Sequence, residues 1–226
     1  MMKNLFQILC GLFLVVSYSS CMHSEEDKVD VLIIGGGASG VTSGIQSARM
    51  GANTLILEES TWLGGMLTSA GVSAVDGNYR LPAGLWGEFK NRLSDYYGGL
   101  DSLKTGWVSN VLFEPSVGNK ILHEMVAAEN NLKVWKQACL EEVKRTGDEW
   151  VAKVKVEGQG VKTVRAKVMI DATELGDVAK ICGVKYDIGM ESRDDTHEDI
   201  APEKKNNIVQ DLSLIHISEP TRRRGI

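Results

Sequence analysis

The sequence predicts an α/β fold built on a doubly wound parallel sheet. Two short runs, fully apolar at residues 31–34 and apolar after Thr54 at residues 54–57, have the composition of strands that are buried on both faces. Between them lie a glycine-rich turn and a stretch whose small residues let a helix pack close to a sheet. The chain has 226 residues, of which 43% are hydrophobic, so it is long enough to bury one sizeable core.

The first strand, Val31–Ile34, ends in Gly35-Gly36-Gly37-Ala38-Ser39-Gly40, which contains the pattern G-x-G-x-x-G. Gly35 permits the tight turn off the strand, and Gly37 lets a pyrophosphate approach the backbone without meeting a Cβ atom. Gly40 lets the following helix lie close to the sheet. Because this pattern follows a strand and opens a helix, it predicts a dinucleotide-binding site.

We expect the helix to run from about Ala38 to Met50, with Gly51 as its stop signal. Its first backbone N–H groups, at Ala38, Ser39 and Gly40, face the phosphates together with the positive end of the helix dipole. This arrangement predicts that the anionic part of the ligand lies at the start of the helix.

A carboxylate stands at the end of the second strand. Glu58 follows the glycines by about twenty residues, the spacing at which an acid accepts hydrogen bonds from an adenosine ribose. NAD(P) and FAD both carry an adenosine, so this unit alone leaves both cofactors open.

Two later segments distinguish between these cofactors. The pair Gly64-Gly65 follows Glu58 closely, where two-dinucleotide flavoproteins bring a second stretch of backbone near the pyrophosphate. Residues 168–173 form an apolar strand that closes on Ala172-Thr173 and is followed by Gly176-Asp177. This segment resembles the strand-end Ala-Thr segment and the Gly-Asp turn of the glutathione-reductase-like FAD superfamily.

The chain most closely resembles the bacterial FAD-dependent oxidoreductase family, which is grouped with the heterodisulfide-reductase-A-like flavoproteins. The resemblance covers residues 29–211, with specific matches at Ile33–Gly40, Trp62–Asp76, Phe113–Pro115, Asp171–Asp177, Ala201–Glu203 and Val209–Asp211. It implies an FAD cofactor, with Asp177 near the ribityl side. The residues we assign to FAD are Gly35, Gly37, Ala38, Ser39, Gly40, Glu58, Gly64, Gly65, Thr173 and Asp177.

The remaining elements follow from the periodicity of apolar residues. We expect the FAD-binding domain to span residues 29–190 and to be interrupted by an insertion at about residues 77–112. The elements predicted within it are an inserted helix over 84–97, a helix over 117–130, a parallel strand over 132–135, and antiparallel strands over 143–157 and 163–168.

The N-terminus has the pattern of an export signal. Lys3 precedes a nearly continuous apolar run at residues 5–16, and small residues lead into Cys21. We interpret residues 1–21 as a lipoprotein signal that leaves Cys21 lipidated, followed by an acidic tether at residues 22–28. Tyr18 departs from the aliphatic residue usual at that position, so ordinary secretory cleavage remains an alternative. Either process predicts a location in the cell envelope, in the periplasm or on the outer surface.

Two cysteines, Cys139 and Cys182, remain after the signal is set aside. They lack the spacing of metal or cluster ligands, so we expect no metal site, in contrast to the iron–sulfur-bearing relatives of the family. In an oxidising envelope they are able to form a disulfide, but two buried thiols are the expected state.

The net charge is −5, which argues against a nucleic acid as partner because phosphate binding needs a basic face. We expect a small-molecule substrate and a membrane contact only through the lipid anchor. The electron acceptor is not readable from these residues.

The C-terminal part of the chain differs in character from the rest. Residues 191–211 are strongly polar, and we interpret them as the start of a substrate domain. Residues 212–226 resemble the translation of a sequencing-library adapter and are excluded from fold reasoning. We therefore expect the C-terminal half of the natural protein to be missing and this chain to be inactive by itself.

The resulting hypothesis is an FAD-dependent oxidoreductase that transfers a hydride between a small substrate and the flavin. No residue of this portion stands out as a catalytic base. Two alternatives stay open: an NAD(P)-binding oxidoreductase, and an envelope lipoprotein that uses the fold only for binding. A flavin absorbance spectrum of the protein distinguishes the first of these from the hypothesis.

Overall fold

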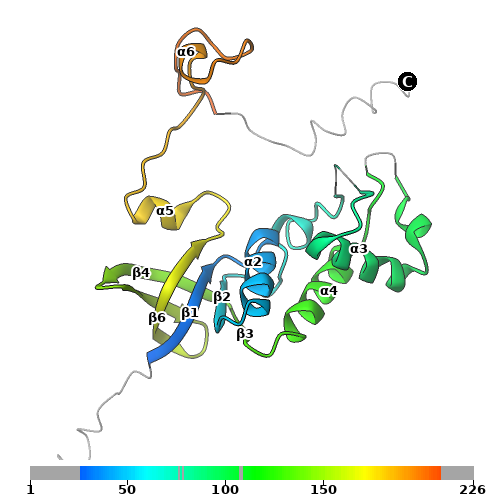
Figure 1. The fold of residues 1–226 in the computed structure, drawn as a ribbon, viewed down its shortest axis with the longest axis horizontal. Helices are drawn as coiled ribbons and strands as arrows, with labels where there is room; N and C mark the ends of the chain where they lie inside the picture. The colour runs from blue at the N-terminus through cyan, green and yellow to red at the C-terminus, as the bar shows by residue number, and fades with distance from the viewer. Residues whose placement is uncertain (1–25, 76, 78, 107–108, 210–226) are drawn as a thin grey trace, which may run out of the picture. The chain divides into compact units, whose positions relative to one another are not determined.

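A computed structural model of the chain describes residues 26–75, 77, 79–106 and 109–209 (Figure 1). The chain divides into two compact units, between Cys182 and Gly183, whereas the sequence suggested a boundary after residue 190. The predicted signal peptide with Cys21 and the segment from residue 212 lie outside the described residues.

The first unit contains one sheet of six strands in the order β3-β2-β1-β6-β5-β4. Strands β3, β2, β1 and β6 run parallel to one another, and β6, β5 and β4 form an antiparallel meander. The strands are β1 (Glu26–Ile34), β2 (Thr54–Glu58), β3 (Leu132–Lys136), β4 (Ala138–Thr146), β5 (Glu149–Val156) and β6 (Gly160–Asp171).

The predicted α/β fold class is confirmed, and the predicted helix after the glycine turn is present. The α-helices are α2 (Ala38–Arg49), α3 (Gly84–Tyr97), α4 (Pro115–Ala127), α5 (Asp177–Ile181) and α6 (Arg193–Thr196), with short 3-10 turns η1 (Gly65–Leu67) and η2 (Leu100–Leu103). Helix α4 begins two residues before the predicted start, because Pro115 suits the first turn of a helix.

Three strand boundaries differ from the sequence-based expectation. Residues 26–28, assigned to a tether, begin β1, where Glu26 forms a 2.7 Å ion pair with Arg165 of β6. The predicted strand over 143–157 is a hairpin, because Gly147 takes a positive φ of 61° at the turn between β4 and β5. The segments around residues 163–168 and 168–171 are one strand, β6, which pairs with β5 on one side and with β1 on the other.

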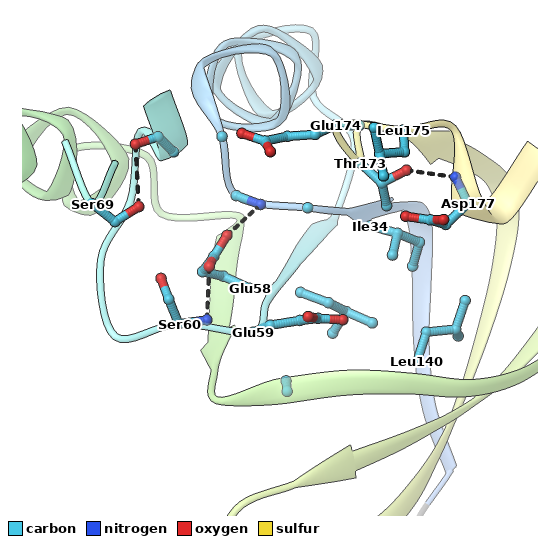
Figure 2. Close-up of a pocket in the computed structure, with 17 residues that line it drawn as sticks. Ile34, Glu58, Glu59, Ser60, Ser69, Leu140, Thr173, Glu174, Leu175 and Asp177 are labelled. Atoms are coloured by element: carbon cyan, nitrogen blue, oxygen red, sulfur yellow. Dashed lines mark hydrogen bonds between the residues drawn. The ribbon is translucent and has the colours of Figure 1, made fainter. Parts of the chain in front are cut away.

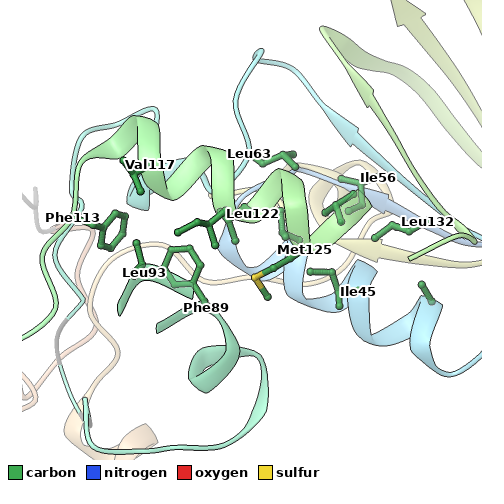
Figure 3. Close-up of a cluster of buried hydrophobic side chains, with 14 of the residues drawn as sticks. Ile45, Ile56, Leu63, Phe89, Leu93, Phe113, Val117, Leu122, Met125 and Leu132 are labelled. Atoms are coloured by element: carbon green, nitrogen blue, oxygen red, sulfur yellow. The ribbon is translucent and has the colours of Figure 1, made fainter. Parts of the chain in front are cut away.

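One face of the parallel strands is covered by helices. Ile33 of β1 and Ile56 of β2 lie in the same buried cluster as Ile45 of α2 and Met125 of α4 (Figure 3). Helix α2 packs close because a Cβ on Gly44 would stand only 2.6 Å from the Ile56 Cδ1 atom. The inserted helix α3 adds its residues Phe89 and Leu93 to the same cluster, along with the edge-to-face pair Phe89–Phe113. In Figure 1 these helices lie together on one side of the sheet.

The opposite face is covered by the meander. Leu32 and Leu55 point away from the helices, because neighbouring strand residues face opposite sides. They lie in a second buried cluster with residues of β5 and β6, and with Val178 of α5. The parallel strands are therefore covered on this side mainly by the antiparallel strands β6, β5 and β4 of the same sheet.

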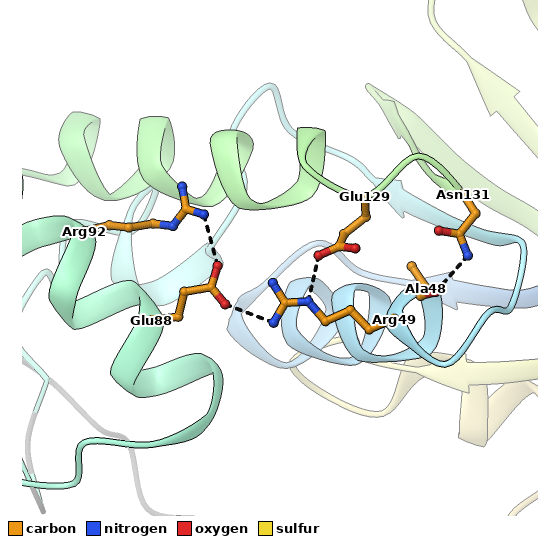
Figure 4. Close-up of polar contacts among 6 residues, drawn as sticks. All are labelled: Ala48, Arg49, Glu88, Arg92, Glu129 and Asn131. Carbon is orange, nitrogen blue, oxygen red and sulfur yellow. Dashed lines mark hydrogen bonds and ion pairs between the residues drawn. The ribbon is translucent and has the colours of Figure 1, made fainter.

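An ion-pair network joins the C-terminal end of α2 to the other two helices (Figure 4). The guanidinium of Arg49 lies 2.9 Å from the Glu88 carboxylate of α3 and 2.7 Å from the Glu129 carboxylate that follows α4. Arg92 pairs with the second oxygen of Glu88, and Asn131 donates to the Ala48 carbonyl. The end of α2 that lies away from the glycine turn is thus tied down by side chains.

In the second unit, helix α6 begins with a capping box formed by Ser192 and Asp195. Met190 and Asn206 form an antiparallel bridge at the base of this segment. Several large apolar side chains of the unit are exposed, among them Tyr186 and Ile200.

Both cysteines are free and exposed, so the expectation of two buried thiols is wrong. Cys139 lies on β4, the last strand of the sheet, and Cys182 directly follows the short helix α5, so neither is covered by a further layer. Among the described residues, no helix is both long and apolar enough to cross a membrane. In the same part of the chain, no group of three or more His, Cys, Asp or Glu side chains is placed to hold a metal ion.

Candidate functional site

A cavity of about 500 Å³ opens at the carboxyl ends of β1, β2 and β6 (Figure 2). Ligands of open α/β sheets bind at this edge, and the volume is within the range of small-molecule sites. The residues that line it are Ile34, Gly35, Gly36, Gly37, Leu57, Glu58, Glu59, Ser60, Gly65, Ser69, Ala138, Leu140, Ala172, Thr173, Glu174, Leu175 and Asp177.

The glycines of the β1–α2 turn fall into two kinds. Gly35 has a φ of +102°, and a Cβ there would stand 2.5 Å from the Ala172 carbonyl oxygen. A Cβ on Gly40 would stand 1.9 Å from the Gly35 carbonyl oxygen, so both glycines are required by packing within the fold. Gly37 has an ordinary φ of −65°, and a Cβ on it would meet no atom within 4 Å. Packing within the fold therefore does not explain this glycine, and the space beside it opens into the cavity.

The N-terminus of α2 is open toward a ligand. Gly37 is its N-cap and offers no side-chain hydrogen bond, and the first helical hydrogen bond runs from the Val41 N–H to the Gly37 carbonyl. Ala38, Ser39 and Gly40, which the sequence assigned to the cofactor site, are not among the residues that line the cavity. Their backbone N–H groups belong to the first turn, which is where helices bind phosphates.

The carboxylate of Glu58 is held in place by two backbone N–H groups. Gly36 and Ser60 each donate to one of its oxygens at 2.7 Å (Figure 2). A Cβ on Gly36 would stand 2.7 Å from the nearer oxygen, so this position also needs glycine. The sequence analysis omitted Gly36, although the unbroken run of three glycines was a signal for it.

The second glycine pair contacts the first turn. The Gly64 N–H donates to the Gly36 carbonyl at 2.8 Å, and a Cβ on Gly64 would collide with Leu122 at 2.6 Å. Gly64 therefore holds the second loop against the first and does not line the cavity. Gly65 does line it, and a Cβ there would stand 3.1 Å from the Gly37 Cα atom. Gly37 and Gly65, which both lack a side chain, thus lie side by side where they line the cavity.

The third wall is the turn from β6 into α5. The Thr173 hydroxyl accepts the Asp177 N–H at 2.9 Å (Figure 2). It donates its single proton to Asp171 at 2.6 Å. Burial raises the pKa of Asp171, but hydrogen bonds from Thr173 and from the backbone outweigh burial and lower the pKa overall. Asp171 was not among the predicted site residues.

The charged side chains that line the cavity are all acidic: Glu58, Glu59, Glu174 and Asp177. An anionic group in this cavity would therefore need backbone N–H groups as its donors, while the carboxylates are suited to accept hydrogen bonds from hydroxyls. Beside the cavity, the Cys139 thiol donates to Glu59 at 3.1 Å, and this hydrogen bond raises the pKa of the thiol. A thiol with a raised pKa is a poor nucleophile.

The arrangement thus suits a ligand with hydroxyl groups on both sides of an anionic centre. The structure brings six of the predicted site residues to the cavity: Gly35, Gly37, Glu58, Gly65, Thr173 and Asp177. Gly40 and Gly64 stand behind it, where they fix the shape of the two glycine turns.

The model of the FAD dependent oxidoreductase family matches residues 30–222 of the chain. This range overlaps the segment from residue 212 that we interpret as foreign sequence, and that interpretation stays a prediction. No curated protein matches the chain significantly.

Solved structures share the fold at low sequence identity. A flavoprotein/dehydrogenase from Cytophaga hutchinsonii is 18% identical, with a TM-score of 0.52 over 70% of this chain and 42% of that chain. The anhydrotetracycline hydroxylase OxyS from Streptomyces rimosus is 14% identical, with a TM-score of 0.51 over 72% of this chain and 36% of that chain. The chain thus spans less than half the length of these two proteins.

Proposed function

The chain belongs to the FAD-dependent oxidoreductase family, whose cofactor is FAD, and we propose that the cavity at the ends of β1, β2 and β6 is its FAD site. In this proposal the pyrophosphate lies on Gly37 and the first turn of α2, next to Gly65. Glu58 accepts hydrogen bonds from the adenosine ribose, and Asp177 faces the ribityl chain. The single observation that carries the proposal is the open space over Gly37, which the fold itself does not require.

The charge distribution supports the same orientation. Glu58 is fixed by two backbone donors but keeps free lone pairs for ribose hydroxyls, since each carboxylate oxygen accepts more than one hydrogen bond. The N-terminus of α2 is free of side-chain caps and compensates the pyrophosphate charge.

The proposed reaction is hydride transfer between a small substrate and the cofactor. When bound, FAD supplies the redox chemistry through its isoalloxazine ring. The residues described here bind and orient its adenosine, pyrophosphate and ribityl parts. In the proposal, the residues that bind the substrate lie in the remainder of the full protein, because this chain covers only 42% and 36% of two solved proteins with this fold.

The test is a binding comparison on the purified full-length protein. We expect a flavin absorbance spectrum in the protein as isolated or after addition of FAD, and calorimetric binding of FAD in preference to NAD and NADP. Preferential binding of NAD or NADP without flavin would contradict the proposal. Bound FAD without reduction by any of a panel of reductants and candidate substrates would instead favour the binding-only alternative.

We also propose that the protein is exported and anchored through Cys21. The support is the sequence pattern alone, which lies outside the described residues. Mass spectrometry of the mature N-terminal peptide distinguishes a lipidated Cys21 from simple secretory cleavage, and a peptide that begins at Met1 would contradict both.

A further inference from the structure

Two strand-to-helix turns reach the same cavity, but only one of their helices has a free N-terminus. At the start of α5, the Asp177 N–H donates to the Thr173 hydroxyl at 2.9 Å. The Ala179 N–H donates to the Asp171 carboxylate at 2.7 Å. Backbone N–H groups in the first turn of α5 are thus already bound by Asp171 and Thr173, the side chains that precede this helix.

These contacts form one connected unit. One oxygen of Asp171 accepts the Thr173 N–H at 3.0 Å and the Thr173 hydroxyl at 2.6 Å, and the other oxygen accepts the Ala179 N–H. We call the side chains of Asp171 and Thr173, with the backbone groups they bind, the Asp171–Thr173 clamp. It ties the last residue of β6 to the first turn of α5 on the cavity side, while Val178 is buried beneath.

We propose that Asp171 is a positioning residue, which through the Asp171–Thr173 clamp fixes Asp177 at the cavity and thereby determines the affinity for the ribityl half of FAD. The inference rests on the proposed function and deepens it. Asp171 does not line the cavity, so its effect on a ligand is transmitted through Thr173 and the start of α5. The Asp177 side chain is exposed, and the backbone N–H of Asp177 is held by the Thr173 hydroxyl at the start of α5.

The Asp171–Thr173 clamp also divides the cavity chemically. Because Asp171 and Thr173 already accept the N–H groups of α5, the pyrophosphate is directed to α2 at the other side. The charged groups on the α5 side are the carboxylates of Glu174 and Asp177, which accept hydrogen bonds from hydroxyls and repel phosphate. A ligand made of adenosine and pyrophosphate alone contacts the α2 side, and the ribityl chain is the part that reaches α5.

The experiment compares FAD with ADP as two probes of the two sides. Thr173→Val keeps the shape of the side chain but removes the hydroxyl, and Thr173→Ser restores the hydroxyl. We expect Thr173→Val and Asp171→Asn to weaken FAD binding about tenfold and to leave ADP binding within about twofold of wild type. Thr173→Ser should bind FAD nearly as wild type does. The circular dichroism of the bound flavin should change in Thr173→Val and Asp171→Asn but not in Thr173→Ser.

Asp30→Asn is the matched control, because Asp30 is a carboxylate on the neighbouring strand that binds Lys167 and the Asn53 N–H away from the cavity. It should leave the affinities for both ligands unchanged. Two results would overturn this inference and leave the proposed FAD site standing. One is an equal loss of FAD and ADP binding in Asp171→Asn, and the other is a Thr173→Ser variant that binds FAD no more tightly than Thr173→Val. A wild-type protein that binds neither probe would instead overturn the proposed function. If Asp171→Asn fails to fold, the Thr173 pair still decides the outcome.

Discussion

The two turns that meet at the cavity differ in how they use the start of a helix. The β1–α2 turn and the β6–α5 turn follow neighbouring parallel strands, and their ends are level because Ile34 pairs with Asp171. They touch through Ala172, whose N–H donates to the Ile34 carbonyl and whose carbonyl lies against Gly35. In the first turn glycines leave the helix start bare, whereas in the second Asp171 and Thr173 occupy it.

The difference shows that the same strand-to-helix geometry serves two purposes. A helix N-terminus whose N–H groups have no side-chain partner attracts an anion. At α5 the N–H groups are already bound by Asp171 and Thr173, so this N-terminus instead holds the residue Asp177 in place. No side-chain hydrogen bond caps the N-terminus of helix α2. The helix is held instead at its C-terminal end by the ion pairs of Arg49 with Glu88 and Glu129 (Figure 4).

The largest expected effect separates the two kinds of glycine in the open turn. Gly40→Ala places a Cβ 1.9 Å from the Gly35 carbonyl oxygen, so we expect a loss of about 3 kcal/mol in the free energy of unfolding. Gly37→Ala meets no atom, so it should unfold as wild type but bind FAD about tenfold more weakly. Urea unfolding and FAD titration measure the two quantities. Equal stability of both variants would remove the distinction between them.

The next effect concerns the acid that belongs to the open turn. Glu58→Gln loses the charge that orders the Gly36 and Ser60 N–H groups and meets the ribose, which is expected to weaken FAD binding about tenfold to a hundredfold. Glu59→Gln is the neighbouring control, since the Glu59 carboxylate accepts a hydrogen bond from the weak donor Cys139, and we expect a smaller change. Isothermal titration with FAD measures both; a larger loss in Glu59→Gln would assign the ribose to the other acid.

The pH dependence of stability tests the occupied turn. The pKa of Asp171 is lowered in the folded protein, because hydrogen bonds to its charged form outweigh burial. The stabilisation from this carboxylate is therefore complete above its unfolded pKa of about 3.9 and is lost as the pH falls through the lower folded value. The difference in unfolding free energy between wild type and Asp171→Asn should be constant from about pH 7 to pH 5 and shrink below about pH 4. Urea titrations at each pH measure it, and a difference that grows on acidification would contradict the prediction.

The smallest effect is at the far end of α2. Glu88→Gln removes the carboxylate that Arg49 and Arg92 share, and because these side chains are partly exposed we expect a loss of about 0.5–1 kcal/mol in the free energy of unfolding. The loss should become smaller in about 1 M salt, where the screening length is about 3 Å. A loss that is independent of salt would show that Glu88 acts through packing and not through charge.

The local elements of the cavity were predictable from the sequence, because their signals lie within a few residues. The apolar strand, the glycines and Glu58 occur in one unit of about thirty residues, and each has a backbone or chemical reason to be where it is. Gly36 was predictable in principle from the same run. The role of Asp171 was not, because its partner Ala179 belongs to a five-residue helix that carries no periodic signal.

The sequence by itself determined the α/β class, the glycine turn that we propose as the dinucleotide site, and the acid that follows it, because short-range backbone geometry dictates those residues. Only the tertiary structure decided that the meander covers one face of the parallel strands and that Cys139 and Cys182 are exposed. It also decided which glycines are required by packing and which one borders the open cavity, since that depends on atoms far away in the chain. Leu122 beside Gly64 and Ala172 beside Gly35 are such atoms, and they become neighbours only when the strands and helices assemble.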